Sequence, residues 1–483
     1  TYYSFYVGID ATPPQITHSA LTDQPLRKWP INIEAGATDN LLIDTVICQY
    51  YLNNVSNSGV FGLTLNANGR YSGIFPGSAG SVNVGDIFYY RICATDGAHT
   101  PNVTYCPASG YFSFRIIDVN GLALVVDDDI GSKSQIELRA DAPLRSAKSY
   151  GETSQQVQRW LTDGGYYAEI VNVAAADTLD FATYDLVIST SGANQYPVSD
   201  RTYREKLADW VSDPAHKLLI EGGEVGYVAL GTSSGYPGFA ANVLHSSAWN
   251  GDESGDLNLL SDYRYHSLVR EPFTLPSVLE LSVDGYYDQD SQRPLAPAYT
   301  IYCNAYHTAD GGIIVYDNNE HPQSAQVIYY AFNFAALSDS QAARQLIVNS
   351  VDYLLANENL PVGAISGRAD LTNRSDDRGV TISLSGAMNR TILTDSLGNY
   401  KFENLYDGYY ELKASITDYY CTDSVIRDIR VAQTEVDDQN FKFDPILNGI
   451  VRGAVTLDRA TNYGGVVILI SGQNLLDTTA TDG

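Results

Sequence analysis

The stretch Gly379-Val-Thr-Ile-Ser-Leu-Ser-Gly386 opens a series of short apolar runs that are separated by Gly, Asn and Asp turns. The same pattern restarts at Gly465-Val-Val-Ile-Leu-Ile-Ser-Gly472, close to the end of the sequence. Short alternating runs bounded by such turns are typical of the strands of a β-sandwich. We therefore predict one β-sandwich over residues 359–445 and an incomplete second copy of it over residues 446–483, which makes these segments tandem β-sandwich repeats.

Residues 11–118 predict another β-sandwich, because apolar and polar residues alternate in runs such as 44–52 and turns rich in Asn, Gly and Pro separate these runs. The segment Tyr2-Tyr3-Ser-Phe5-Tyr-Val7 matches Tyr111-Phe-Ser-Phe-Arg-Ile116 in its aromatic and apolar positions. We therefore interpret residues 1–10 as the last strand of a preceding sandwich domain. The alternative is an ordinary first strand whose likeness is accidental.

Residues 119–358 change to an α/β pattern. Unbroken apolar runs such as 121–126 and 185–190 alternate with amphipathic segments near residues 154–162 and 201–211. Strands that are apolar on both faces belong to a parallel sheet that helices cover on each side. The predicted fold class is thus multidomain: a β-sandwich, a flavodoxin-like α/β parallel sheet, and tandem β-sandwich repeats.

The formal charge of the 483-residue chain is −28, from 57 acidic and 29 basic residues. Nucleic acids and anionic membranes attract clustered Lys and Arg, so neither is an expected partner. No run approaches the roughly 20 apolar residues of a membrane-spanning helix, so we expect no membrane insertion. The sequence starts at Thr1 and is rich in Tyr, Ser, Thr, Asn and Gly. We expect a mature or excised piece of an extracellular, cell-surface bacterial protein.

The five cysteines include no pair at metal-ligand spacing. Cys93 and Cys106 flank a turn-rich stretch, and a disulfide between them would join two strand ends in an oxidising compartment. Cys48 lies in another predicted strand and is the competing partner for Cys93. The alternative is that these cysteines are free and serve as small buried apolar side chains.

The segment 363–444 resembles the carboxypeptidase-regulatory-like, or CnaB-like, β-sandwich. The resemblance rests on Gly379–Gly386, on Thr394-Asp395-Ser-Leu-Gly-Asn-Tyr-Lys-Phe402 and on Gly408-Tyr-Tyr410. It implies a non-enzymatic module of a secreted or cell-surface protein. Some members of the family form Lys–Asn isopeptide cross-links, for which this segment offers the three lysines Lys401, Lys413 and Lys442.

Residues 119–358 resemble the class I glutamine-amidotransferase-like flavodoxin fold of large secreted bacterial proteins, some of them related to gingipain-type peptidases. The resemblance rests on the stretches 123–129, 184–192 and 217–226. Residues 11–118 are similar to fibronectin-III or Ig-like modules of bacterial surface proteins, with Asp10-Ala-Thr-Pro-Pro14 at the domain entrance.

Catalytic members of the amidotransferase-like fold carry a Cys at a tight strand-to-helix turn, as Gly-x-Cys-x-Gly. Backbone N–H groups at such a turn lower the thiol pKa and stabilise an oxyanion. This chain has Gly222-Gly-Glu-Val-Gly226, so Glu224 stands at the nucleophile position. A carboxylate cannot perform thiol acyl transfer, and we therefore predict no catalytic residue.

Four acidic residues follow parallel strands of this domain, namely Asp127, Asp128, Asp129 and Glu224. Ligands bind at the carboxyl ends of such strands. Three interpretations remain open at this point. The acids hold a divalent cation, for which calcium is one candidate; they act as acid and base in a hydrolase; or they bind no cofactor and instead cap helices and accept hydrogen bonds from loop N–H groups.

The sequence as a whole predicts a non-catalytic extracellular structural or adhesive protein, such as a subunit of a fibre or lattice. The alternative is a fragment of a secreted hydrolase or peptidase whose catalytic part lies elsewhere or uses the acidic cluster. Asp-Ser/Thr-apolar triplets such as 395–397 resemble a bacterial O-glycosylation signal and predict glycan attachment. The strand edges and apolar faces of incomplete sandwich segments must be covered by other strands, either through self-association or by further domains of the same polypeptide. The predicted assembly strands contain Tyr2, Tyr3, Phe5, Val7, Val466, Val467, Ile468 and Ile470.

Overall fold

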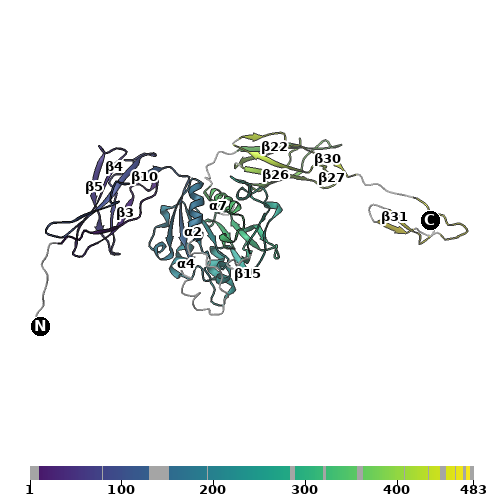
Figure 1. Cartoon of the computed structure of the whole chain (residues 1–483). Helices are drawn as coiled ribbons and strands as arrows, with labels where there is room; N and C mark the ends of the chain where they lie inside the picture. The colour runs from purple at the N-terminus through teal and green to yellow at the C-terminus, as the bar shows by residue number, and fades with distance from the viewer. Residues whose placement is uncertain are drawn as a thin grey trace. The chain divides into compact units, whose positions relative to one another are not determined.

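The computed structural model divides into two compact units, which are described separately: residues 1–264 with 268–358, and residues 265–267 with 359–483 (Figure 1). The structure describes residues 10–78, 80–129, 152–192, 194–282, 289–318, 322–355, 363–406, 408–432, 434–446, 453–462, 464–470 and 475–478.

Two sheets form a β-sandwich in the N-terminal part of the first unit, as predicted. Their inner faces share one core, in which Trp29 stacks on Phe88 with ring centroids 4.7 Å apart. The first sheet has the order β1-β3-β7-β6, and the second has β2-β10-β8-β4-β5, with β9 beside β8. The strands are β1 (Gln15–Thr17), β2 (Gln24–Pro25), β3 (Asn32–Thr38), β4 (Ile43–Leu52), β5 (Ser58–Gly62), β6 (Thr64–Leu65), β7 (Tyr71–Ile74), β8 (Ile87–Asp96), β9 (Val103–Cys106) and β10 (Phe112–Ile117).

The predicted disulfide between Cys93 and Cys106 does not form, since all five cysteines are free. The register of the strands explains why. Cys106 lies opposite Ile92, and Cys93 lies opposite Tyr105. Neighbouring residues in a strand point to opposite faces, so the two thiols lie on opposite faces of the sheet. The competing pair fails for the same reason, because Cys48 is also opposite Ile92.

A parallel sheet follows, in the order β12-β11-β13-β14-β21. Every residue of β11 is buried, because helices cover both faces. Ala123 and Val125 pack in one core with α2 and α7, whereas Leu124 and Val126 pack in a second core with α4. The elements are β11 (Leu122–Asp127), β12 (Tyr167–Asn172), β13 (Leu186–Thr190), β14 (Lys217–Glu221), β21 (Gln326–Tyr330), α2 (Glu152–Asp163), α3 (Val173–Ala176), α4 (Arg201–Val211), α5 (Pro237–Asn242) and α7 (Ser340–Leu355).

Antiparallel strands extend this sheet beyond β21. The order continues as β20-β19-β16-β17, and β18 pairs with both β15 and β20. The added elements are β15 (Ser246–Glu253), β16 (Leu257–Leu259), α6 (Ser267–Arg270), β17 (Val278–Leu279), β18 (Gln289–Pro294), β19 (Tyr299–Asn304) and β20 (Gly311–Tyr316).

The second unit contains a β-sandwich between Gly363 and Pro445, in agreement with the prediction. Two sheets, β25-β22-β30-β27 and β24-β23-β26-β28, enclose one apolar core. The strands are β22 (Gly363–Leu371), β23 (Thr381–Gly386), β24 (Arg390–Leu393), β25 (Asn399–Leu405), β26 (Gly408–Ser415), β27 (Tyr419–Tyr420), β28 (Val425–Val431), β29 (Glu435–Val436) and β30 (Phe441–Pro445).

The predicted restart of the repeat contains a two-stranded hairpin, β31 (Val467–Ile470) with β32 (Leu475–Thr478). A glycine with positive φ stands at the matching position of both copies, Gly379 at +90° before β23 and Gly465 at +84° before β31. Val467 and Ile468 are 61 % and 40 % exposed. The other predicted assembly strand, Tyr2 to Val7, lies outside the described residues.

Candidate functional site

The three aspartates at the end of β11 are buried, and Asp127 and Asp128 accept hydrogen bonds from nearby donors. Asp127 accepts hydrogen bonds from the N–H of Asp129, at 3.0 Å, and from the hydroxyl of Ser154, at 2.9 Å. Asp128 accepts one from the N–H of Val198, at 2.6 Å, and a longer one from Asn194. These contacts agree with the third interpretation of the acids, in which their carboxylates accept hydrogen bonds from neighbouring groups of the chain.

Glu221, the last residue of β14, is the acid at this edge that sequence reasoning missed. Its side chain is buried and accepts hydrogen bonds from three backbone N–H groups, those of Ser191 at 3.0 Å, Gly192 at 3.1 Å and Phe334 at 3.0 Å. Glu221 thereby ties β14 to the loops that follow β13 and β21. The available sequence signal is its place directly after an apolar run, which it shares with Asp127.

Two of these acids titrate close to neutral pH. Burial raises the pKa of Asp128 to about 7, and the charges of Asp127 and Asp129 act in the same direction. Burial also raises the pKa of Glu221 to about 7, although the N–H groups that donate to it favour the ionised form. The carboxyl edge therefore holds two acids that are protonated below neutral pH.

Side chains of β18 pack closely against Gly226 in the turn after β14. Gly226 follows Glu224 after one residue, and a side chain at Gly226 would overlap the amide of Gln292 and approach the carboxylate of Asp290. Asp290 is fully buried and accepts hydrogen bonds from the indole N–H of Trp249 and from a backbone N–H. Polar side chains thus fill the space beside Gly226, two residues after the position where a catalytic Cys would stand.

The four acids predicted as metal ligands are not the group whose ligand atoms converge in the described part of the chain. Within the described part of the chain, one set of three such side chains brings its ligand atoms within 4.8 Å of one another, namely Asp10, Asp39 and Asp96 of the first sandwich. Asp127 and Asp128 instead use their oxygens for the loop contacts described above. The predicted calcium site at the sheet edge therefore lacks support in the geometry.

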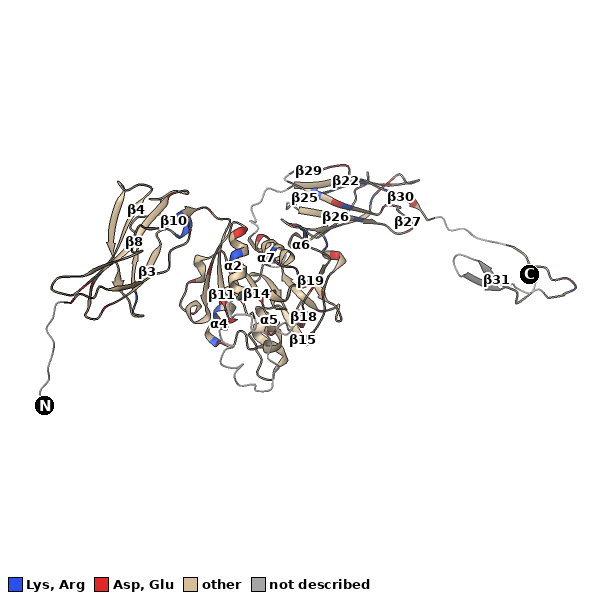
Figure 2. Cartoon of the chain, in the orientation of Figure 1, with Lys and Arg blue, Asp and Glu red and all other residues tan. Residues whose placement is uncertain are grey.

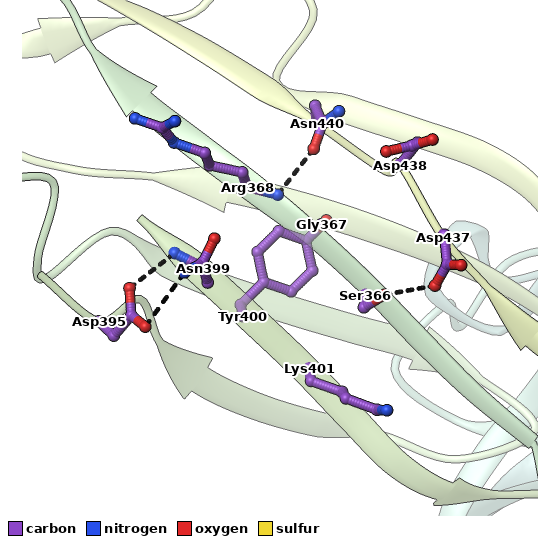
Figure 3. Close-up of a pocket in the computed structure, with 10 residues that line it drawn as sticks. All are labelled: Ser366, Gly367, Arg368, Asp395, Asn399, Tyr400, Lys401, Asp437, Asp438 and Asn440. Carbon is purple, nitrogen blue, oxygen red and sulfur yellow. Dashed lines mark hydrogen bonds between the residues drawn. The ribbon is translucent and has the colours of Figure 1, made fainter. Parts of the chain in front are cut away.

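The second unit has an open hollow of about 590 Å³ on the outer face of β22 and β25 (Figure 3). Arg368 and Lys401 supply positive charge, and Asp395 and Asp437 supply negative charge. Several of these polar groups form hydrogen bonds with other groups of the chain. Asp437 accepts a hydrogen bond from the hydroxyl of Ser366, and Asp395 accepts hydrogen bonds from backbone N–H groups of its own turn. The hollow is a polar surface whose groups largely bind one another.

The lysines of this sandwich are all exposed, namely Lys401, Lys413 and Lys442. Lys401 forms ion pairs with Glu435, at 2.9 Å, and with Glu403, at 3.6 Å. Its amine is therefore bound to carboxylates, and the geometry gives no support to a Lys–Asn cross-link at this residue.

The ribbon coloured by charge shows Lys and Arg as short separate segments among the described residues, without a continuous basic stretch (Figure 2). This distribution agrees with the net charge of −28. None of the helices in the described residues has the length and apolar character that crossing a membrane requires.

No protein-family model and no curated protein matches the sequence. Among solved structures, the minor pilin of Streptococcus agalactiae is similar over 42 % of this chain and 89 % of its own, at 12 % identity and a TM-score of 0.18. A streptococcal ancillary pilin is similar over 50 % of this chain and 78 % of its own, at 12 % identity and a TM-score of 0.18. The Bacillus anthracis TIE protein is similar over 91 % of this chain and 59 % of its own, at 6 % identity and a TM-score of 0.15. At such values the likeness carries no argument about fold or function.

Proposed function

We propose that this chain is a non-catalytic structural or adhesive element of a bacterial cell surface. The observation that carries the proposal is the bonding of Glu221 at the carboxyl edge of the parallel sheet, where sheets of this kind bind ligands. Three backbone N–H groups from two loops donate to this one carboxylate. A side chain that holds loops together in this way is poorly placed to act on a substrate.

The finer domain assignments belong to the same proposal. They are a fibronectin-III or Ig-like sandwich over residues 11–118, a degenerate amidotransferase-like domain over 119–358, and a CnaB-like sandwich over 359–445. The strand order of the parallel sheet supports the second assignment, because numbering these strands along the chain gives 2-1-3-4-5, the order of flavodoxin-like sheets. Glu224 at the nucleophile position supports an inactive member of that fold.

A hydrolysis assay tests this proposal. We expect the full chain to release no product above the blank from a panel of peptides and glycans, because the nucleophile position holds Glu224 in place of a Cys. The panel is read by mass spectrometry over a day at pH 5, 7 and 8. Sustained turnover that the Glu224→Gln variant abolishes would contradict the proposal.

A secreted hydrolase is the second candidate function, and one observation favours it. Asp128 and Glu221 both have a pKa raised to about 7 by burial, and a general acid or base works best with a pKa near the operating pH. The same panel separates the two candidates. Turnover that is lost in Asp128→Asn, but kept in the surface variant Glu205→Gln, would establish the hydrolase.

We further propose that the chain functions within a larger assembly, through self-association in a fibre or lattice or through further domains of the same polypeptide. The exposure of β31 supports this, because Val467 on one face of the strand and Ile468 on the other are both open to solvent. A two-stranded ribbon is marginal by itself, and its edges accept further strands. The triplet 395–397 lies on the surface, which supports its proposed use for glycan attachment.

Sedimentation over a hundredfold range of concentration tests the self-association. We expect the sedimentation coefficient of the full chain to rise with concentration, and Val467→Lys to suppress the rise because the charge opposes burial of this face. Leu457→Lys is the control, since Leu457 is also exposed, at 42 %, but lies outside the strand. A wild-type chain that stays monomeric throughout rules out self-association through β31.

A further inference from the structure

Three acidic side chains meet at one end of the N-terminal sandwich, although they are far apart in the sequence. Asp10 precedes β1, Asp39 directly follows β3, and Asp96 is the last residue of β8. One carboxylate oxygen from each lies within 4.8 Å of the others. Because β3 and β8 belong to different sheets, the cluster brings together both sheets and the entering chain.

Two oxygens of this cluster are closed off from solvent and have no hydrogen-bond partner, Oδ2 of Asp10 and Oδ1 of Asp39. Their sister oxygens are bonded, that of Asp10 to the N–H of Thr12 at 3.0 Å and that of Asp39 to the N–H of Leu41 at 2.8 Å. A buried acceptor without a donor is costly, and native proteins rarely leave one in this state. A ligand that binds carboxylates would satisfy these two oxygens.

The third carboxylate is held in place by hydrogen bonds. Asp96 is only 1 % exposed. Asn102 and Ala98 donate hydrogen bonds to its carboxylate, at 2.8 to 3.2 Å. No Lys, Arg or His forms an ion pair with any of the three acids in the part of the chain that the structure describes. The cluster thus concentrates negative charge without a cation from the protein.

We propose that Asp10, Asp39 and Asp96 bind a calcium ion that joins the two sheets of the sandwich to the chain entering it. The ligand set is all oxygen, which suits calcium and magnesium and not the softer metals that prefer His or Cys. Calcium fits better, because it accepts irregular carboxylate sets together with water, whereas magnesium demands near-ideal octahedral geometry. This site is distinct from the acids at the edge of the parallel sheet.

Calcium titration of the full chain tests the proposal, after chelator treatment and dialysis. We expect one site with a Kd of about 10⁻⁴–10⁻³ M, the range of extracellular modules. The first thermal transition should rise by several degrees in 10 mM calcium chloride, because a ligand that binds only the folded state stabilises it. Magnesium at the same concentration should give at most a fifth of this shift.

Asp39→Asn is the diagnostic variant, because an asparagine keeps an acceptor for the N–H of Leu41 while it removes the charge. We expect it to weaken calcium binding at least tenfold, and Asp10→Asn provides a second variant should the first fold poorly. Asp44→Asn, an exposed aspartate of β4, and Glu224→Gln serve as controls that keep the calcium response. The proposal fails if calcium produces no heat and no thermal shift, if both cluster variants respond like the wild type, or if magnesium acts equally well.

Discussion

Replacing Gly398 by alanine is expected to unfold the second unit's sandwich under conditions in which the wild type stays folded. Gly398 has a φ of +80°, and a Cβ there would overlap the carbonyl oxygen of Ala369 in β22. The left-handed conformation costs alanine about 1–2 kcal/mol. The overlap would also separate β22 from the turn before β25, where the N–H of Ala369 donates a hydrogen bond to the carbonyl oxygen of Gly398 at 2.9 Å. We expect a total loss of about 3–4 kcal/mol.

Gly379→Ala is the matched control for this prediction. Gly379 has a similar φ, +90°, but the position where its Cβ would stand is open. Its substitution should therefore cost about 1 kcal/mol, from the backbone conformation alone. Hydrogen exchange at the amides of β22 and β25 in the full chain measures both variants. Equal protection in the two would show that close packing at Gly398 is unimportant.

The stability of the first unit is expected to fall as the pH rises from 4.5 to 8. Asp128 and Glu221 have ordinary pKa values near 4, and burial raises both to about 7. The folded state therefore binds more protons than the unfolded state over this interval. The resulting stabilisation is complete below pH 4 and is lost as the pH passes through 7, by up to about 3 kcal/mol for each group.

Glu221→Gln should flatten this dependence and also destabilise the unit at every pH. Oε1 of Glu221 accepts from Ser191 and Gly192, and Oε2 accepts from Phe334. A glutamine can replace only one of these oxygens, so the N–H of Phe334 loses its acceptor, at a cost of about 1–3 kcal/mol.

Thermal unfolding at pH 5 and pH 8 tests this prediction, with Glu205→Gln as the control. Glu205 is an exposed residue of α4 that forms a surface ion pair with Arg201. The control should keep the wild-type difference between the two pH values. A Glu221→Gln variant that also keeps this difference would show that Glu221 does not titrate near neutral pH.

The parallel strands could be predicted from the sequence because burial on both faces removes the need for alternation. The apolar runs predicted at 121–126 and 185–190 appear as β11 and β13, with bounds that differ by at most one residue. The role of Glu221 could not be predicted, because its three donors lie between 29 and 113 residues away in the chain. In the sequence, an acidic residue after an apolar run gives the same pattern whether loops or water surround its side chain in the structure.

Register was the second feature that the sequence could not supply. Cys93 and Cys106 lie in adjacent strands, as expected, but a shift of one residue decides whether two side chains share a face. The meeting of Asp10, Asp39 and Asp96 depends on how two sheets pack at one end of a sandwich. Neither alternation nor turn composition reports on that packing.

The five free thiols have a practical consequence for handling and for the chemistry of the protein. Burial raises the pKa of Cys48 to about 12 and also raises those of Cys93, Cys106 and Cys303, so few thiolates exist at neutral pH. Thiolates, not thiols, attack alkylating reagents and disulfides. Burial of the thiols thus protects them from oxidation in the oxidising environment proposed for this protein. Production in a reducing cytoplasm needs no oxidant or disulfide isomerase, because the fold contains no disulfide among its five cysteines.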